Sequence, residues 1–214
     1  MDSKPSRALS GRRGEAERNH ARILEAARAV FVADPGAPIS AVAKFAGVGI
    51  SALYRRYPSK EELLRKLCAD GLAEYIAAAE AALDDTVDPW TAFTHFMHRV
   101  VNADSHSLTL RLAGTFTPTE ELRREAERAR GLDLRLVERT KAAGVIRADL
   151  SPDDLSFLFE QLAAVRVRDE DRTRELRLRY LSLQLDALHN HSRTSLPGTA
   201  PSWKEISERW EPVP

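Results

Sequence analysis

A short basic and aromatic segment carries the side chains best suited to bind a polyanion. Ser51, Tyr54, Arg55 and Arg56 offer a hydroxyl, a phenol and two guanidinium groups within one short stretch. Such groups donate hydrogen bonds to phosphate oxygens and to the edges of nucleic-acid bases. The segment predicts a nucleic-acid contact, provided that its side chains share one exposed face.

Three histidines offer a different chemistry. His95 and His98 stand three residues apart in a predicted helix, and His106 follows. Such a trio could ligate a metal ion or act as acid and base. No acidic residue stands at a confirming spacing, and the His189-Asn190-His191 tripeptide lacks a strand-flanked metal context. An enzyme is the competing interpretation. Because both patterns are incomplete, we expect no catalytic residue, metal site or cofactor.

A helix, a glycine turn and a second helix would present the basic segment on one face. Val42, Ala43 and Ala46 repeat at helical spacing before Gly47 and Gly49, and a second apolar set follows at Ile50, Leu53 and Tyr57. Glycine tolerates the positive φ of a tight turn. If the two apolar sets pack together, Ser51, Ala52, Tyr54, Arg55 and Arg56 point outward. This is the layout of a helix-turn-helix DNA reader.

The residues after this segment predict the start of a third helix. Pro58 ends the preceding helix, and Ser59 with Glu62 forms a capping-box pattern. Lys60 then lies at the exposed beginning of the new helix.

From about Arg18 to Leu67 the sequence resembles the tetracycline-repressor (TetR) family of bacterial transcription regulators. The resemblance rests on these residues: Ile23-Leu24-Glu25-Ala26-Ala27, Phe31, Val42-Ala43, Ala46-Gly47-Val48 and Leu53-Tyr54-Arg55-Arg56-Tyr57-Pro58-Ser59-Lys60-Glu61-Glu62-Leu63. The chain has Ser51-Ala52 where the family commonly has Gly-Thr. It also has Ala37-Pro38 near the family's capping Thr or Ser, so the helix must start with Pro38 or use Ser40.

The resemblance implies that Tyr54 and Lys60 hold phosphates, and we expect Arg55, Arg56 and Ser51 to contact bases or both groups. The predicted DNA-binding set is Ser40, Ser51, Ala52, Tyr54, Arg55, Arg56, Tyr57 and Lys60. The competing interpretation is a three-helix packing module in which Tyr54 and Tyr57 are core aromatics and the arginines are merely solvated.

The charge distribution favours DNA binding. Residues 1–60 contain 11 Lys and Arg against 5 Asp and Glu, although the whole chain has 32 of each kind. A basic head on an acidic body is typical of a protein in which one part binds phosphates.

The remaining sequence predicts an all-α fold. We expect a flexible basic arm over residues 1–15, a helix-turn-helix domain over 16–62 with its motif at about 38–57, a helical regulatory and dimerisation domain over 63–191, and a mostly irregular tail over 192–214. The single cysteine, Cys68, excludes an internal disulfide, and no apolar stretch is long enough to span a membrane. We expect a cytoplasmic protein without a membrane partner.

Two predicted helices, 152–168 and 171–189, are apolar on two faces, which predicts a homodimer because a second buried face needs a partner. On the later helix, Leu176, Tyr180, Leu183 and Ala187 form one stripe. The expected interface is Leu158, Leu162, Leu178, Leu181, Leu185 and Leu188. A dimer would read an inverted-repeat operator whose half-sites lie about 34–36 Å apart.

The resemblance also implies a cavity for a small apolar or amphipathic effector, and hence a ligand-responsive repressor. The predicted lining is Trp90, Phe93, Phe96, Met97, Asn102, Arg111, Leu112, Phe116, Leu136, Phe159, Gln161 and Arg166. The alternative is that these aromatic and apolar residues are core, because a pocket and a core use the same residue types. A helical binding protein without operator control is a further alternative.

Overall fold

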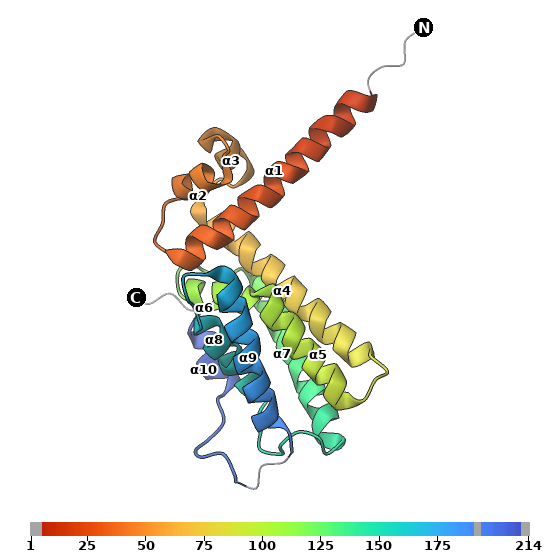
Figure 1. Ribbon diagram of the computed structural model, residues 1–214. Coiled ribbons are helices and arrows are strands. Elements are labelled where there is room, and N and C mark those ends of the chain that lie inside the picture. Colours follow the sequence, from red (N-terminus) through yellow and green to blue (C-terminus); the bar gives the residue numbers. More distant parts are fainter. Residues whose placement is uncertain (1–5, 191–193, 211–214) are drawn as a thin grey trace. The chain divides into compact units, whose positions relative to one another are not determined.

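The structure, a computed structural model, describes the backbone of residues 6–190 and 194–210, and the side chains within these ranges except those of 6–17, 105 and 109–111. Ten helices and no strand occur in this part of the chain, which confirms the all-α fold (Figure 1). They are α1 (Ser6–Ala33), α2 (Ile39–Ala46), α3 (Ile50–Arg56), α4 (Lys60–Asp84), α5 (Pro89–Ala103), α6 (Ser105–Leu112), α7 (Glu120–Ala142), α8 (Asp154–Ala164), α9 (Glu170–Leu188) and α10 (Trp203–Glu208). None of the described helices is long and apolar enough to cross a membrane.

Contacts within the chain define two compact units, residues 1–67 and 68–214. The boundary falls inside α4, so this one helix contributes residues to both units. Each unit has its own hydrophobic core.

Helix α1 begins at Ser6, which corrects the expected flexible arm for residues 6–15. No proline interrupts the sequence between Pro5 and the end of α1, and Ala8, Leu9 and Arg12 are good helix formers. These propensities outweigh Gly11 and Gly14. Residues 1–5 of the expected arm lie outside the described residues.

The turn between α2 and α3 depends on one glycine rather than two. Gly47 has φ 64°, in the left-handed region that glycine adopts readily. The backbone N–H of Val48 then donates to the Ala43 carbonyl at 3.0 Å, closing the end of α2. Gly49 has φ −65°, which any residue can adopt. At the start of α2, Pro38 occupies the N-cap position without a side-chain cap.

The first core joins three helices. Phe31 of α1, Val42 of α2 and Leu53 of α3 are fully buried, and Arg22 donates to the Ala46 carbonyl at 2.6 Å. Ile50, expected to face inward, is 40% exposed because it begins α3 at the turn. This packing leaves the opposite face of α3 in solvent.

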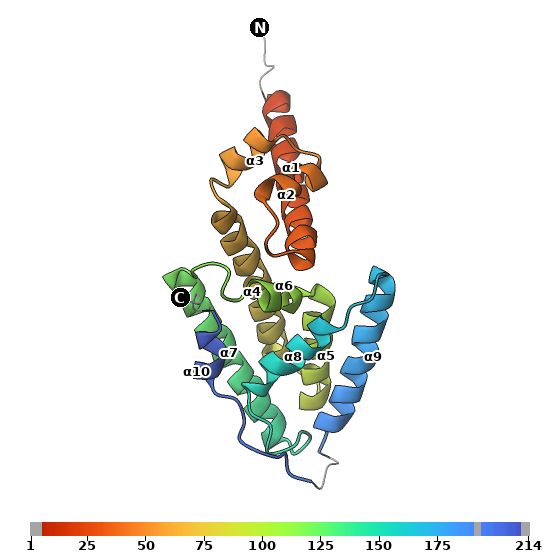
Figure 2. The same ribbon diagram turned by 90° about the vertical axis from the view of Figure 1, so that its left-hand side faces the viewer.

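The second unit packs α5 against α7, α8 and α9 (Figure 2). Its core includes Phe93, Phe96 and Met97 of α5, Leu136 of α7 and Phe159 of α8. The Asp88 side chain accepts from the backbone N–H groups of Trp90 and Thr91, which caps α5.

A buried arginine ties α9 to its neighbours. Arg177 donates to Asp104 Oδ1 at 2.5 Å, to Ser107 Oγ at 3.0 Å, and to the carbonyls of Ala163 and Val165 at 3.0 and 3.1 Å. Because the two carbonyls lie at the C-terminal end of α8, the guanidinium satisfies backbone acceptors that this helix end would leave unpaired.

The tail packs on the bundle through a short capped helix. Ser202 and Glu205 form a capping box at the start of α10. Arg209, just after α10, donates to Glu160 at 2.7 Å, and the Trp210 ring meets Phe116 with centroids 6.0 Å apart. The mostly irregular tail expected from the sequence gave no sign of this docking.

Candidate functional site

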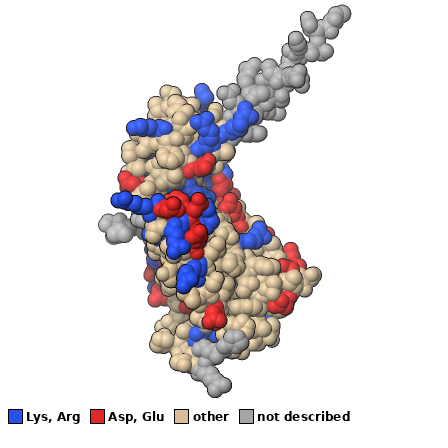
Figure 3. Space-filling view, in the orientation of Figure 1, with Lys and Arg blue, Asp and Glu red and all other residues tan. Residues whose placement is uncertain are grey.

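The outward face of α3 carries most of the predicted DNA-binding side chains. Ser51, Ala52, Arg55 and Arg56 are exposed, and Tyr54 is 48% exposed. On the face shown in Figure 3, most of the charged side chains on the unit that contains α3 are Lys and Arg, whereas the second unit carries charges of both signs. Short polar and cationic side chains on one exposed helix face can contact phosphates and base edges.

Tyr57 differs from this arrangement. Its side chain is only 6% exposed, and its hydroxyl lies 3.1 Å from His20 Nδ1 of α1. The predicted contact of Tyr57 with DNA is therefore corrected to a core role, as its apolar spacing with Leu53 also indicated.

Lys60 lies against its own unit rather than extending into solvent. Its Nζ donates to the Pro35 carbonyl at 2.7 Å and sits 5.1 Å from the centre of the Phe31 ring. Ser59 accepts from the Glu62 N–H at 3.1 Å, as the capping pattern predicted. Ser40 is exposed near the start of α2. For Lys60 to reach a phosphate, its ammonium group would have to leave the Pro35 carbonyl.

Sequence reasoning missed two exposed apolar side chains, one in α2 and one at the start of α3. Phe45 is 66% exposed and Ile50 is 40% exposed. The available signal was helical phase, because Phe45 lies off the face defined by Val42 and Ala46. Apolar side chains beside a reading helix can contact thymine methyl groups.

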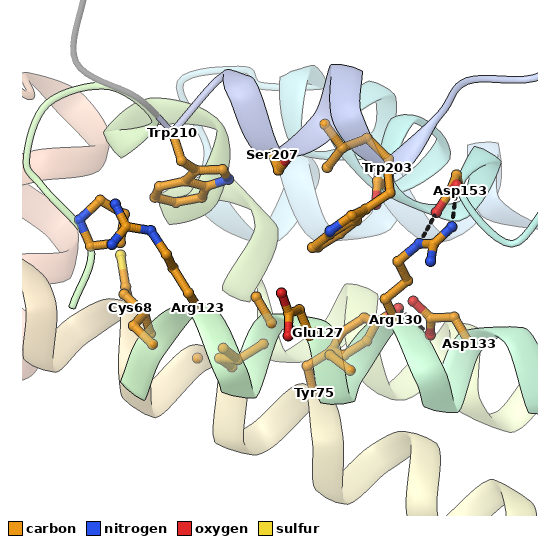
Figure 4. Close-up of a pocket in the computed structure, with 18 of the residues that line it drawn as sticks. Cys68, Tyr75, Arg123, Glu127, Arg130, Asp133, Asp153, Trp203, Ser207 and Trp210 are labelled. Atoms are coloured by element: carbon orange, nitrogen blue, oxygen red, sulfur yellow. Dashed lines mark hydrogen bonds and ion pairs between the residues drawn. The ribbon is translucent and has the colours of Figure 1, made fainter. Parts of the chain in front are cut away.

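The second unit contains a cavity of about 390 Å³. Figure 4 shows α4 and α7 on one side and the α10 segment on the other. Its lining is Cys68, Gly71, Leu72, Tyr75, His106, Pro118, Leu122, Arg123, Ala126, Glu127, Ala129, Arg130, Asp133, Pro152, Asp153, Ser156, Trp203, Ile206, Ser207 and Trp210. Mixed apolar, aromatic and charged lining at this volume is typical of a small-molecule site.

Two buried carboxyls lie at one end of the cavity. The Tyr75 hydroxyl donates to Asp133 Oδ1 at 2.7 Å, and Arg130 holds both oxygens of Asp153 at 2.8 and 3.0 Å. Burial raises the pKa of Asp133 to about 8, and the nearby charge of Asp153 adds to this rise. Burial also raises the pKa of Tyr75, and the neighbouring Asp133 adds to it.

His106 is a neutral wall of the cavity. Burial lowers its pKa to about 4, and its ring packs on Phe159 with centroids 4.6 Å apart. Within the described residues, its buried Nδ1 has no hydrogen-bond partner. A neutral imidazole leaves the charge of the cavity to its carboxyl and guanidinium groups.

None of the predicted effector residues whose side chains the structure describes lines this cavity. Phe93, Phe96, Met97, Leu112, Phe116, Leu136 and Phe159 are buried, and Trp90 packs on His189 with centroids 4.6 Å apart. Asn102, Gln161 and Arg166 are exposed, and the Arg111 side chain lies outside the described residues. The apolar periodicity identified the core of the bundle, whereas the lining comes from the less apolar faces of α4 and α7 and from the tail.

The expected dimer face is largely core. Leu162, Leu181, Leu185 and Leu188 are at most 7% exposed within one chain, and only Leu158 and Leu178 are half-buried. The other stripe of α9 points outward instead, with Tyr180 at 44% and Leu183 at 59% exposure. The sequence showed two stripes correctly but could not tell which one faces the chain's own bundle.

The histidine trio is dispersed. His95 is largely exposed with its Nδ1 3.9 Å from Asp85, whereas His106 is buried at the cavity. In the part of the chain that the structure describes, no three histidine, cysteine or acidic side chains form a possible metal site.

Two family models match the chain. The model of bacterial regulatory proteins of the tetR family matches residues 23–67, which include α2, α3 and the start of α4. The model of the C-terminal domain of SbtR-like transcriptional regulators matches residues 88–190. The first match contains the exposed face of α3, and the second ends before α10.

Several solved structures share the fold. A TetR transcription regulatory protein from Mycobacterium vanbaalenii is 26% identical, with a TM-score of 0.54 over 83% of this chain and 98% of that one. A TetR regulator from Streptomyces coelicolor is 24% identical, with a TM-score of 0.55 over 80% and 99%. LfrR from Mycobacterium smegmatis, crystallised with proflavine, is 23% identical, with a TM-score of 0.54 over 78% and 95%. No curated protein sequence matches the chain significantly.

Proposed function

Because the chain belongs to the TetR family of DNA-binding transcription regulators, we propose that it is a ligand-responsive repressor that binds an inverted-repeat operator as a homodimer. The observation that carries this proposal is the exposed face of α3, where Ser51, Tyr54, Arg55 and Arg56 point to solvent while Leu53 is fully buried. Because its buried face packs on the core of its own unit, this helix can enter the major groove with its outward face and keep its contacts with that core.

Within this face, we assign sequence reading to Arg55, Arg56 and Ser51, and phosphate contacts to Tyr54 and Lys60. Arginine binds guanine edges through two hydrogen bonds, whereas a lysine ammonium binds phosphate as a point charge. Residues 16–62 form the DNA-binding domain in this proposal, and residues 63–191 form the effector-binding and dimerisation domain.

The proposed dimer uses the outer face of α9. Tyr180 and Leu183 are apolar and exposed, and Ala187 continues their stripe one turn further on. Gln184 of α9 lies 3.4 Å from Gln161 of α8, so α8 flanks this face. A twofold pairing of these faces would cover the exposed side chains and set two reading helices against two half-sites.

The proposed effector site is the cavity of the second unit. Cys68, Gly71, Leu72 and Tyr75 of α4 line it, and the same helix begins at Lys60 within the first unit. A ligand can change operator affinity through α4 only if it binds more tightly to the protein with α4 in one placement than in another. Repression relieved by ligand is the behaviour that such a difference produces.

We also infer that the protein is not an enzyme and acts in the cytoplasm, where bacterial DNA lies. A helical binding protein without operator control would lack sequence preference, although its basic unit would still hold DNA at low salt. Sequence preference is therefore the property to measure.

Selection of random DNA duplexes by the purified full-length protein tests this function. We expect an inverted-repeat consensus whose enrichment survives raised salt. Salt-sensitive binding without a consensus would overturn the repressor assignment, and a single unrepeated half-site would overturn the dimeric reading.

A further inference from the structure

The C-terminal segment forms one wall of the cavity in the second unit. Trp203, Ile206, Ser207 and Trp210 belong to the lining, whereas the matched SbtR-like domain ends at residue 190. Part of the binding chemistry of the cavity therefore comes from residues that lie beyond the matched domain.

The cavity contains a buried carboxyl without a cationic partner. Asp133 and Asp153 are each only 7% exposed, and the nearby Arg130 is committed to both oxygens of Asp153. Asp133 Oδ1 accepts from Tyr75, but within the described residues Oδ2 has no hydrogen-bond partner and no cation pairs with this carboxyl. Burying an uncompensated carboxylate is costly, so a cation from outside would be favoured beside it.

A second carboxyl faces the aromatic wall. Glu127 lines the cavity from α7, and in the described part of the chain it has no hydrogen bond or ion pair. Figure 4 shows Glu127 opposite Trp203 and Trp210, which project from the other wall. The faces of indole rings attract cations, and Trp203 already has the Arg130 guanidinium 5.4 Å from its ring centre.

The balance of charges disfavours an anionic ligand. The lining contains three carboxyl groups and two guanidinium groups, those of Arg123 and Arg130. Arg130 is already neutralised by Asp153, and the lining imidazole of His106 is neutral because burial lowers its pKa to about 4. Once Asp133 is ionised, an anion would meet more negative than positive charge.

We propose that this cavity binds an organic monocation with a flat apolar body. The charged group lies beside the carboxyls of Asp133 and Glu127, and the body packs against the indoles of Trp203 and Trp210 and the side chains of Leu72 and Leu122. This inference rests on the proposed function in taking the cavity as the effector site, and it names the class of that effector.

Binding of such a cation releases a proton. In the empty cavity the pKa of Asp133 is about 8, so at neutral pH the carboxyl is mostly protonated, and a cation beside it favours ionisation. Affinity should therefore rise between pH 6 and pH 8. The titratable groups around Asp133 are Cys68 and Tyr75 of α4, His106 of α6, Arg123, Glu127 and Arg130 of α7 and Asp153 before α8, and none of the four lining residues from the tail is charged.

The test uses three flat tricyclic probes of similar shape: the N-methylacridinium cation, neutral acridone and the anthraquinone-2-sulfonate anion. Isothermal titration calorimetry on the full-length protein should show that the cation binds at least about tenfold more tightly than either other probe. Its affinity should rise by about tenfold or more from pH 6 to pH 8, whereas that of acridone should not change.

Two variants locate the charge. Glu127→Gln and Asp133→Asn should each weaken cation binding by about fivefold to tenfold and leave acridone binding unchanged, because each keeps the shape and removes a negative charge. Glu138→Gln, an exposed change on α7 outside the lining, is the matched control. Equal binding of the three probes, preference for the sulfonate, or unchanged cation affinity in both variants would overturn the inference.

Operator binding is measured on the same samples, so the two proposals fail separately. A protein that selects an inverted repeat but does not prefer the acridinium cation refutes only the ligand class. A protein that binds the cation but selects no DNA sequence refutes the repressor function.

Discussion

The buried carboxyl of Asp133 makes the stability of this protein depend on pH in a direction opposite to that of most acidic residues. Burial raises its pKa from 3.8 to about 8. Between these values the folded chain keeps a proton that the unfolded chain has released. Raising the pH therefore favours the unfolded chain until the carboxyl ionises in the folded state as well.

The substitution Asp133→Asn isolates this effect. Asn keeps the shape and an oxygen that can accept from Tyr75 at the observed 2.7 Å, but it does not titrate. Each pH unit in the window should change the difference in unfolding free energy between the two proteins by about 1.4 kcal/mol. Over the three units from pH 5 to pH 8, the variant should gain roughly 4 kcal/mol relative to the unmodified protein.

Urea unfolding followed by circular dichroism at pH 5, 6.5 and 8 measures this gain. The protein concentration must be constant because a dimer's apparent stability depends on it. Asp84→Asn, at the exposed end of α4, controls for a general loss of one acidic group. A difference between Asp133→Asn and the unmodified protein that stays constant with pH would refute a protonated, buried Asp133.

Three further substitutions test other parts of the structure. Arg56→Ala should weaken operator binding about tenfold and relax its sequence preference in a mobility-shift assay, whereas Arg99→Ala on α5 should do neither. If the Arg56→Ala protein bound the operator as tightly as the unmodified protein, Arg56 would not contact DNA. Leu183→Glu should give a monomer in light scattering because it places a charge in the proposed α9 interface. Leu134→Glu, at an exposed site on α7, should leave the dimer intact. A dimeric Leu183→Glu protein would show that the outer face of α9 is not the interface. Arg177→Met should lower the free energy of unfolding by about 3 kcal/mol in urea unfolding, because the carbonyls of Ala163 and Val165 and the partly exposed Asp104 carboxylate lose this buried donor. The same change at exposed Arg179 should cost far less; an equal loss in both variants would show that the network of Arg177 is not stabilising.

The sequence predicted the helical fold well because the relevant signals are local. Asp88 before Pro89 is sufficient to begin α5, and the phase of Val42 and Ala46 is sufficient to orient α2. The outward face of α3 followed from the same phase. The spacing of Tyr57 with Leu53 indicated its burial, but local signals could not show that its hydroxyl lies beside His20 of a distant helix or that Lys60 donates to the Pro35 carbonyl.

The cavity could not be found in the same way. Periodicity identifies residues that avoid water but does not distinguish a filled core from a lined space, so Phe93 and Phe159 were candidates for either. The cavity depends on the docking of Trp203 and Trp210, which are far from α4 in sequence. The choice between the two stripes of α9 likewise depended on which face meets α5, a tertiary contact that the helix pattern alone does not specify.

The docked tail makes one wall of the cavity an exchangeable part. Its polar anchors on the bundle are Arg209 with Glu160, Arg147 with the Thr194 carbonyl, and the Leu196 N–H with Asp149. A chimaera that keeps these anchors but carries other residues at 203, 206 and 210 would recognise a different molecule with the same reading helix. With the cavity as the proposed effector site, redesign of the tail alone would therefore change the molecule that the protein senses and leave its DNA-binding helix unaltered.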